Sequence, residues 1–249
     1  TAADWSWWRK RRFAYLAHGA GSKVVVHIHS GKFDQWLSKK NFGRTNHFCL
    51  DIENTHAQVV VLSEDWERIL SPILGHVKPI NNPLDPKLKH SSKVRKKDQL
   101  LLLGRNSKVK GHDFAEKVIS NLVLEFPSLR LVMSGVKKTN SKNVEALGWI
   151  SEEEKLELLQ SSTALLLPSK YEGQPMVAIE ALACGLPVIA SEHLASLPAE
   201  VVQVTHTVEE WNRVLRRIIS DPPLVDFNSE PYSIEVISKK WKELYHSND

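Results

Sequence analysis

Two basic residues follow a run of leucines at 100–103, and an arginine with a lysine can together bind a diphosphate. Arg105 comes directly after Gly104, and Lys110 and Gly111 follow a few residues later. Arginine binds an oxyanion through two parallel hydrogen bonds, while lysine supplies a mobile point charge. Glycines let the backbone approach a ligand. The pattern predicts a phosphate-binding loop, with an ordinary solvated loop as the alternative.

A second segment, from Glu172 to Ser191, combines carboxylates with the start of a short predicted helix. Pro175 stands near the first turn, where proline removes no hydrogen bond, and the N–H groups there form an anion site. Glu172 precedes the helix, and Glu180 lies further into it among apolar neighbours. A buried carboxylate requires hydrogen-bond donors. Vicinal hydroxyls or a neighbouring Arg or Lys could supply them to Glu180.

Two histidines, His27 and His29, alternate to the same face of a predicted strand at 23–30. Three interpretations compete: a metal pair, core histidines, or a contact between His29 and a sugar at a cleft. No carboxylate or cysteine cluster near them in the sequence completes a metal site, so we expect no metal. We expect His29 at the cleft and His27, deeper in the strand, in a structural role.

These candidate residues need elements to position them, and predicted strands and helices alternate along the chain. The first part is expected to contain a helix at 4–17, then strands at 23–30, 58–62 and 77–81 with helices at 33–40 and 64–74. The second part is expected to contain strands at 100–105, 130–134, 144–149, 164–168, 187–191 and 201–204, with helices at 113–125, from 151, and at 176–184, 208–219 and 232–245. Such alternation indicates parallel sheets.

The second part reads as a complete doubly wound domain. The first part lacks the usual first strand and its glycine-rich turn, so we expect an incomplete domain. Between them, residues 86–98 are densely basic without apolar periodicity, which is typical of a linker. We therefore expect domains at 1–85 and 99–249 joined by the linker at 86–98.

Composition and charge limit the class of protein. The 249 residues are 42% hydrophobic and 25% charged, which gives room for one large or two small domains. Residues 1–97 hold 17 Lys and Arg against 8 Asp and Glu, a net charge of +9, and residues 98–249 hold 16 against 21, a net charge of −5. The basic half favours an anionic partner or, alternatively, is a solvated face.

Further sequence features favour a cytoplasmic protein. No run reaches the roughly 18 uninterrupted apolar residues of a membrane-spanning helix, and the first residues lack a signal-peptide layout. Cys49 and Cys184 lie far apart without a C-x-x-C pairing, which fits a reducing compartment.

The first predicted helix mixes aromatic and basic side chains, namely Trp5, Trp7, Trp8, Arg9, Lys10, Arg11 and Arg12. Such a mixture favours peripheral contact with anionic headgroups at the inner face of a membrane. Alternatively, the tryptophans pack against strands that would precede them. We expect no nucleic-acid partner, because the basic residues are spread out without an aromatic-interleaved binding strand.

Together the motifs resemble a known family. The pairing of G-R-x4-K-G at 104–111 with E-x7-E at 172–180, followed by A-L-A-C-G-x-P-V, is similar to the retaining group 1 glycosyl transferases. H-I-H-S-G at 27–31 resembles the H-x-H-G motif of bacterial capsule and lipopolysaccharide transferases. The resemblance covers nearly the whole chain. It implies an α/β GT-B fold, with two Rossmann-like doubly wound domains of which the first is incomplete.

The resemblance also implies a role for each candidate residue. Arg105 and Lys110 would hold the donor diphosphate, Glu172 would take hydroxyls of the donor sugar, and Glu180 would take the ribose. The remaining donor-binding residues would be a backbone stretch for phosphate and sugar and a pair against the nucleobase: Gly173, Gln174, Pro175, Met176 and Val177, and Trp149 and Ile150. Many members carry an aromatic residue and a glycine where this chain has Gln174 and Pro175, a difference that bears on donor preference.

The function expected from these features is a glycosyltransferase that needs no metal and no cofactor. It would move a sugar, with retention, from a nucleotide-diphosphate donor such as a UDP-sugar to a saccharide or lipid-linked acceptor in surface glycan biosynthesis. His29 would act in catalysis beside Arg105, Lys110 and Glu172. One alternative is a glycosidase that uses Glu172 and Glu180. Another is a truncated or split half that binds nucleotide-sugar but is inactive without further strands or a partner chain.

Overall fold

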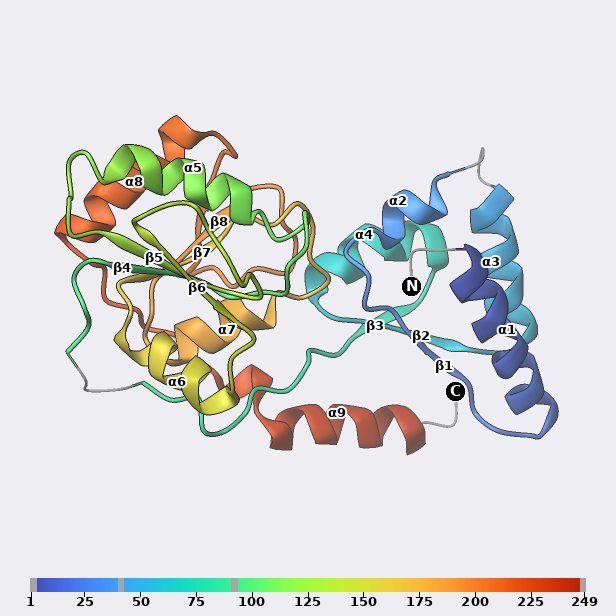
Figure 1. Cartoon of the computed structure of the whole chain (residues 1–249). Helices are drawn as coiled ribbons and strands as arrows, with labels where there is room; N and C mark the ends of the chain where they lie inside the picture. Colours follow the sequence, from blue (N-terminus) through green and yellow to red (C-terminus); the bar gives the residue numbers. More distant parts are fainter. Residues whose placement is uncertain (1–3, 40–42, 91–93, 247–249) are drawn as a thin grey trace. The chain divides into compact units, whose positions relative to one another are not determined.

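The computed structural model of the chain describes residues 4–39, 43–90 and 94–246. Its backbone contacts divide the chain into two compact units (Figure 1). The first unit contains residues 1–83, 171–174 and 230–249, and the second contains residues 84–170 and 175–229. Lys40 of the helix expected at 33–40 and residues 91–93 of the expected linker lie outside the described residues.

The second unit is built on a six-stranded parallel sheet of order β6-β5-β4-β7-β8-β9. The strands are β4 (Gln99–Leu102), β5 (Arg130–Ser134), β6 (Val144–Gly148), β7 (Ala164–Leu167), β8 (Val188–Ser191) and β9 (Val202–Val204). Counted from β4, this is the 3-2-1-4-5-6 order of a doubly wound sheet. The prediction of a parallel sheet with a doubly wound topology is confirmed for this part of the chain.

Helices cover both faces of this sheet, which explains why its strands are almost entirely apolar. Helices α5 (His112–Leu122) and α8 (Val208–Ser220) lie on one face, and α6 (Glu152–Ser161) and α7 (Met176–Ala183) lie on the other (Figure 1). Fully buried Leu100, Leu131, Ile119 and Trp211 belong to the core between the sheet and the first pair of helices.

A capping box stands at the start of α6. The Ser151 hydroxyl accepts a hydrogen bond from the Glu154 N–H at 3.1 Å, and the Ser151 N–H donates to the Glu154 carboxylate at 2.7 Å. These two bonds satisfy N–H groups that have no partner inside the helix. They fix where α6 begins, and therefore which of its side chains face α7.

The expected linker is anchored to the second unit at its C-terminal end. The half-buried Arg95 guanidinium donates hydrogen bonds to the carbonyls of Leu159 at 3.0 Å, Ser162 at 3.2 Å and Cys184 at 2.6 Å. Leu159 and Ser162 stand at the end of α6, and Cys184 is the C-cap of α7. A single cation therefore satisfies carbonyls at the ends of two helices, where the helix dipoles also favour positive charge.

The first unit contains a parallel sheet of order β1-β2-β3 within the described residues. The strands are β1 (Val25–His27), β2 (Gln58–Val61) and β3 (Val77–Pro79), and the helices are α1 (Asp4–Gly19), α2 (Phe33–Leu37), α3 (Gly43–Asn54), α4 (Glu64–Leu74) and α9 (Ile234–His246), with a short 3-10 turn at Glu230–Tyr232 before α9. Helix α3 was not among the expected elements. It buries only Phe48 and Asp51, so it lacks a long apolar stripe.

The closing helix α9 packs on the sheet of the first unit. Ile237 and Leu244 of this helix form a core cluster with Val60 and Ile80, and the Lys23 ammonium donates to the Leu244 carbonyl at 2.9 Å. The sequence placed this helix in the domain expected at 99–249. The contacts group it with the first unit instead, because its apolar stripe covers β2 and not the larger sheet.

Helix α1 has one packed face and one exposed aromatic face. On the packed face, Trp7 and Tyr15 donate to the buried Asp51 carboxylate at 3.0 and 3.1 Å, and the Trp7 ring lies 4.5 Å from that of Phe48. The exposed face carries large apolar side chains at helical spacing, namely Trp5, Trp8, Phe13 and Leu16. Residue type alone could not tell the buried Trp7 from the exposed Trp5 and Trp8.

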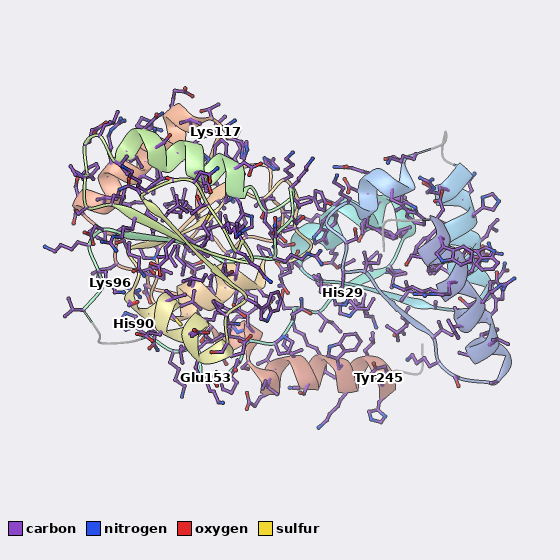
Figure 2. All side chains as sticks on the ribbon, in the orientation of Figure 1. His29, His90, Lys96, Lys117, Glu153 and Tyr245 are labelled. Carbon is purple, nitrogen blue, oxygen red and sulfur yellow. The ribbon has the colours of Figure 1, made fainter. Side chains whose placement is uncertain are left out.

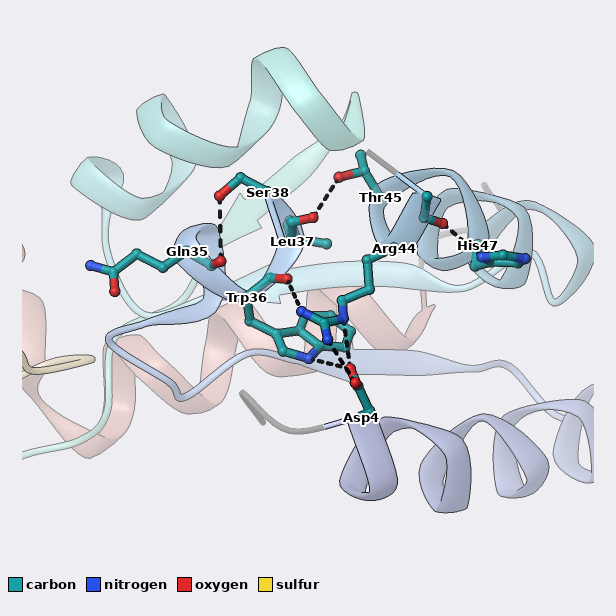
Figure 3. A network of polar contacts seen from close by, with 9 residues as sticks. Asp4, Gln35, Trp36, Leu37, Ser38, Arg44, Thr45 and His47 are labelled. Atoms are coloured by element: carbon teal, nitrogen blue, oxygen red, sulfur yellow. Dashed lines mark hydrogen bonds and ion pairs between the residues drawn. The ribbon is translucent and has the colours of Figure 1, made fainter. Parts of the chain in front are cut away.

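A polar network joins the start of α1 to α2 and α3 (Figure 3). The Asp4 carboxylate accepts from the Trp36 indole at 3.0 Å and from the Arg44 guanidinium at 2.6 Å. The same guanidinium donates to the Trp36 carbonyl at 3.0 Å. These contacts hold three helices together on the side chain of one acidic residue.

Among the described residues, no helix is long and apolar enough to cross a bilayer.

Candidate functional site

The candidate site in the second unit lies at the carboxyl edge of the six-stranded sheet. In this topology the chain leaves β4 and β7 in opposite directions, and ligands bind where the two neighbouring strands diverge. The Gly104 N–H after β4 donates to the hydroxyl of Ser134, the last residue of β5, at 3.0 Å. A Cβ at Gly135 would stand 2.1 Å from the Gly104 carbonyl oxygen, and Gly135 has φ +79°, so only glycine fits there.

The loop after β7 closes against the loop after β4. The Lys170 N–H donates to the Val109 carbonyl at 2.8 Å. A Cβ at Gly111, whose φ is +76°, would lie 2.4 Å from the Pro168 carbonyl oxygen. The backbone therefore passes too close for any side chain at this position. Helix α5 starts immediately afterwards, and the His112 ring contacts the Ser134 carbonyl at 3.1 Å.

Arg105 and Lys110 stand on this packed loop. The Lys110 stem lies over Gly104, because a Cβ added to that glycine would meet the lysine Cγ and Cδ at 3.1 and 3.2 Å. Arg105 is the next residue and is exposed. The two side chains predicted to hold the diphosphate therefore stand on one loop, at the edge where the topology puts a ligand.

Helix α7 begins at the end of the loop that follows β7. Its first turn is the predicted anion-binding turn. Its N-cap is Pro175, which forms no side-chain cap hydrogen bond, and Met176 and Val177 open the helix half-buried. The N–H groups of a first helical turn have no partner within the helix and carry the positive end of its dipole. This turn can therefore receive an anion.

Glu180 of α7 has a protein partner. Its Oε1 lies 3.2 Å from the Lys155 Nζ of α6, which also lies 2.6 Å from the exposed Glu152 carboxylate. Burial lowers the pKa of Lys155, but pairing with Glu152 and Glu180 outweighs burial, so the pKa is raised. Sequence reasoning left a neighbouring Arg or Lys open and did not name Lys155. No local spacing in the sequence indicates this partner, because Lys155 lies on a different helix, 25 residues from Glu180.

Trp149 and Ile150 follow β6 at the same carboxyl edge. Gly148, with φ +70°, turns the chain out of the strand. Trp149 is 85% exposed, a large apolar surface for a tryptophan of a packed unit. An exposed aromatic ring offers a stacking surface for another planar ring, and contact of Trp149 and Ile150 with a nucleobase stays a prediction.

His29 and Glu172 lie on adjacent loops of the first unit. A Cβ at Gly31 would stand 2.2 Å from the Glu172 carbonyl carbon, and a Cβ at Gly173 would stand 2.2 Å from the His29 carbonyl oxygen. The two backbones therefore touch without side chains between them. The Trp66 indole donates to the Gly173 carbonyl at 2.5 Å and fixes the second loop.

Gln174 is held by the first unit through both ends of its amide. Its Nε2 donates to the Asn81 side chain at 2.8 Å, and its Oε1 accepts from the Asn82 N–H at 2.8 Å. The side chain is buried. Gln174 therefore serves here to fix the loop that carries Glu172 and Gly173, and only its backbone can serve a ligand.

His27, the last residue of β1, is in direct contact with His29, which follows the strand. The His29 Nε2 lies 3.1 Å from the His27 Nδ1, and Figure 2 labels His29 in the first unit. Burial and the neighbouring His29 lower the pKa of His27 from 6.5 to about 4, and burial also lowers the pKa of His29. In the part of the chain that the structure describes, no group of three or more His, Cys, Asp or Glu residues could hold a metal.

Comparisons with known proteins place this geometry in a family. Residues 85–226 match the family described as glycosyl transferases group 1. A Haemophilus influenzae protein named as an uncharacterized glycosyltransferase is 30% identical over 187 residues, which are 66% of this chain and 52% of the relative. The amylovoran biosynthesis glycosyltransferase AmsD of Erwinia amylovora is 26% identical over 226 residues, which cover 79% of this chain and 63% of that protein.

A solved structure shares the fold. The Anabaena protein HepE, crystallised with UDP and glucose, superposes with a TM-score of 0.73 at 16% identity, over 93% of this chain and 73% of that one. The match spans 52% of the Haemophilus relative and 63% of AmsD, so the chain covers only part of these proteins. Because the family match covers more than half of the chain, from the first strand of the six-stranded sheet through α8, the chain belongs to the group 1 glycosyl transferases and has their GT-B fold.

Proposed function

We propose that this chain transfers a sugar, with retention of configuration, from a UDP-sugar to a saccharide or lipid-linked acceptor in the synthesis of a surface polysaccharide. The polysaccharide assignment is supported by AmsD, whose name connects it with amylovoran biosynthesis. UDP as the leaving nucleotide is supported by HepE, which was solved with UDP and glucose.

One observation carries the proposal: Lys110 folds over Gly104 beside Arg105 at the carboxyl edge of the six-stranded sheet. Two cations held on a loop that is packed by backbone contacts are pre-organised for a diphosphate. The first turn of α7 would add N–H groups to the same anion. Glu180 would accept the ribose hydroxyls, and Trp149 with Ile150 would lie against the base.

The chemistry would depend on stabilising the leaving group. If the acceptor hydroxyl enters on the face that the diphosphate leaves, its proton passes to a phosphate oxygen and the protein needs no nucleophile. Arg105 and Lys110 would then neutralise negative charge that grows as the glycosidic C–O bond breaks. Removing one such preorganised group typically raises the barrier by about 2.7–4 kcal/mol. Neither a metal nor a cofactor has a part in this proposal.

Glu172 and His29 would serve the sugar. Their loops touch through Gly31 and Gly173, so a sugar that met one loop would be within reach of the other. The Glu172 carboxylate would accept sugar hydroxyls. His29, whose lowered pKa favours the neutral ring at pH 7, would donate or accept a single hydrogen bond without adding charge.

The exposed face of α1 would contact an anionic lipid surface. Trp5, Phe13 and Leu16 are more than half exposed, and the Arg12 guanidinium lies 3.8 Å over the Trp8 ring. Exposed aromatic rings with cations on the same helix are typical of helices that lie in a membrane interface. Such a contact would bring the enzyme to a lipid-linked acceptor.

Two rival functions make different predictions. A glycosidase needs a carboxylic acid that donates a proton, whereas the Glu180 carboxylate lies 3.2 Å from the Lys155 ammonium and pairs with it. A split half would bind nucleotide-sugar but would not turn it over alone. Because the chain spans 52% of its Haemophilus relative, donor hydrolysis by this chain, with and without added acceptor, separates the split half from a complete enzyme.

The direct test is nucleotide binding by the whole chain. UDP, GDP and ADP are compared by thermal shift and calorimetry, and UDP is expected to bind most tightly. Lys110→Ala should weaken UDP binding by about tenfold or more, because a charge-assisted hydrogen bond is lost. Lys108→Ala on the same loop is the matched control and should bind like the parent. Equal binding by parent and Lys110→Ala would refute the diphosphate site.

A further inference from the structure

The ion pair between Lys155 and Glu180 connects two helices within the second unit. Lys155 and Glu180 expose only 19% and 16% of their side chains, whereas Glu152 exposes 79%. Lys155 therefore reaches from an exposed carboxylate to a nearly buried one. The contact lies inside one unit, so it does not depend on the arrangement of the two units.

The lysine engages only one oxygen of Glu180. The Lys155 Nζ contacts Oε1 at 3.2 Å, and in the described part of the chain Oε2 has no hydrogen-bond partner. A carboxylate oxygen has two lone pairs, so Oε1 can accept a further bond while it holds the lysine. Both oxygens can therefore still receive a pair of neighbouring hydroxyl groups.

The ion pair also holds the Glu180 side chain in place before a ligand arrives. The contact with Lys155 restricts the rotamers of Glu180, so less freedom is lost when a ligand binds. The lysine also places a positive charge on the protein side of a carboxylate that would lie near the negative charge of a nucleoside diphosphate.

We infer that Lys155 is a positioning residue for nucleoside recognition: through its contact with Oε1 it holds the Glu180 carboxylate in the orientation that accepts the vicinal hydroxyls of a ribose. Lys155 itself does not touch the ligand. This inference rests on the proposed function, because it assumes that Glu180 faces the ribose of a nucleoside diphosphate.

The test measures selectivity for the ribose hydroxyls. Calorimetry gives the dissociation constants of UDP and of 2′,3′-dideoxy-UDP, and their ratio reports what the hydroxyls contribute. The parent should prefer UDP by about ten- to hundredfold, the range for hydrogen bonds to a charged group. Lys155→Met should lower this ratio by about tenfold, while Lys155→Arg should retain most of it. A purely structural role would weaken binding of both nucleotides alike.

Controls keep the outcome decisive. Glu152→Gln removes the exposed partner and should leave the ratio unchanged. Lys155→Gln is a second variant that keeps a hydrogen-bond donor without the charge, in case the methionine variant does not fold. In the background of Glu180→Gln, replacing Lys155 should have no further effect on the ratio, because the two residues act through the same contact.

The possible results distinguish failure of the inference about Lys155 from failure of the proposed function on which it rests. A folded Lys155→Met or Lys155→Gln with the parental ratio overturns the inference alone. A parent that binds UDP and its dideoxy analogue equally overturns both the inference and the ribose role of Glu180. A parent that binds none of UDP, GDP and ADP overturns the proposed function itself, and the inference with it.

Discussion

Gly104 and Lys110 depend on each other for the shape of the candidate diphosphate loop. The lysine stem occupies the space that a side chain at position 104 would fill. Sequence reasoning identified both residues, because a glycine beside an arginine and a lysine beside a glycine are visible as types and spacings. It did not identify Ser134, which fixes the Gly104 N–H from the end of the neighbouring strand.

Titration of His27 should make the stability of the first unit depend on pH. Burial and His29 lower the pKa of His27 from 6.5 to about 4, so between these values the unfolded chain binds more protons than the folded chain. The stabilisation is complete above pH 6.5 and is lost as the pH falls towards 4. For a half-buried ring we expect about 1 kcal/mol, or about 2–4 °C in the unfolding midpoint.

The measurement is thermal unfolding of the parent and of His27→Gln across this pH range. The parent should lose more stability on acidification than the variant. His76→Gln, which removes an exposed histidine, should follow the parent. A parent and a His27→Gln variant with the same pH dependence would show that His27 does not carry the effect.

The partner of Glu180 illustrates the limit of prediction for single residues. The sequence indicated that this carboxylate required hydrogen-bond donors, and it left hydroxyls and a basic side chain open. Lys155 is 25 residues away, on a different helix, and only the packing of α6 against α7 selects it among the many lysines. A pairing of that kind depends on the tertiary fold and not on local spacing.

Among the elements, the start of α5 should be sensitive to a single added methyl group. Gly111 has φ +76°, and a Cβ there would meet the Pro168 carbonyl oxygen at 2.4 Å. Gly111→Ala combines a left-handed backbone with a steric overlap, so we expect a loss of about 2–5 kcal/mol in the free energy of unfolding. Urea unfolding of the second unit, followed by circular dichroism, measures it.

Gly148 provides the matched comparison. Its φ is +70°, but the nearest atom to an added Cβ is the flexible Lys137 side chain at 3.5 Å, an ordinary contact. Gly148→Ala should therefore cost only the backbone strain, about 1–2 kcal/mol. If both alanine variants lose the same free energy of unfolding, the close approach of the Pro168 carbonyl to position 111 does not affect stability.

Among the helices and strands, those of the second unit were predicted best from the sequence, and helix α3 was not predicted at all. Strands buried on both faces are apolar along their length, and caps mark the helices between them, so the six strands could be expected from pattern alone. Helix α3 buries one face only at Phe48 and Asp51. Because the buried face of α3 itself includes a charged residue, hydrophobic periodicity could not identify this helix.

For the molecule as a whole, the aromatic face of α1 predicts binding to anionic vesicles. Phe13 and Leu16 expose 65% and 70% of their surface. Replacing both with serine should weaken binding to phosphatidylglycerol vesicles by about tenfold or more, because two apolar side chains no longer enter the interface. Leu124→Ser with Leu224→Ser, two exposed leucines of the second unit, is the matched control.

Sedimentation with vesicles measures this, with neutral phosphatidylcholine as the reference lipid. Parental binding should weaken as salt rises, because the cations of α1 act through screened attraction. Equal sedimentation of the parent and the Phe13→Ser, Leu16→Ser double variant would exclude this face as the contact.

The division of the chain into two units was the feature that was hardest to predict from the order of residues in the sequence. A basic, aperiodic stretch suggested a simple linker at 86–98, yet segments 171–174 and 230–249 belong to the first unit. Chain order carries no information on such returns. They follow from the apolar stripe of α9, which pairs with Val60 and Ile80, and from the amide of Gln174, which pairs with Asn81 and Asn82.

The return of α9 defines where relatives can exchange parts. A chimera that took everything after the basic stretch from another member would bring a foreign last helix to the recipient's β2, with Ile237 and Leu244 replaced beneath Val60. A graft of residues 84–229 that keeps the recipient's own 171–174 leaves that interface intact. Recombination that preserves folding should therefore inherit the last helix with the first strands, although almost the entire second unit separates them in the gene.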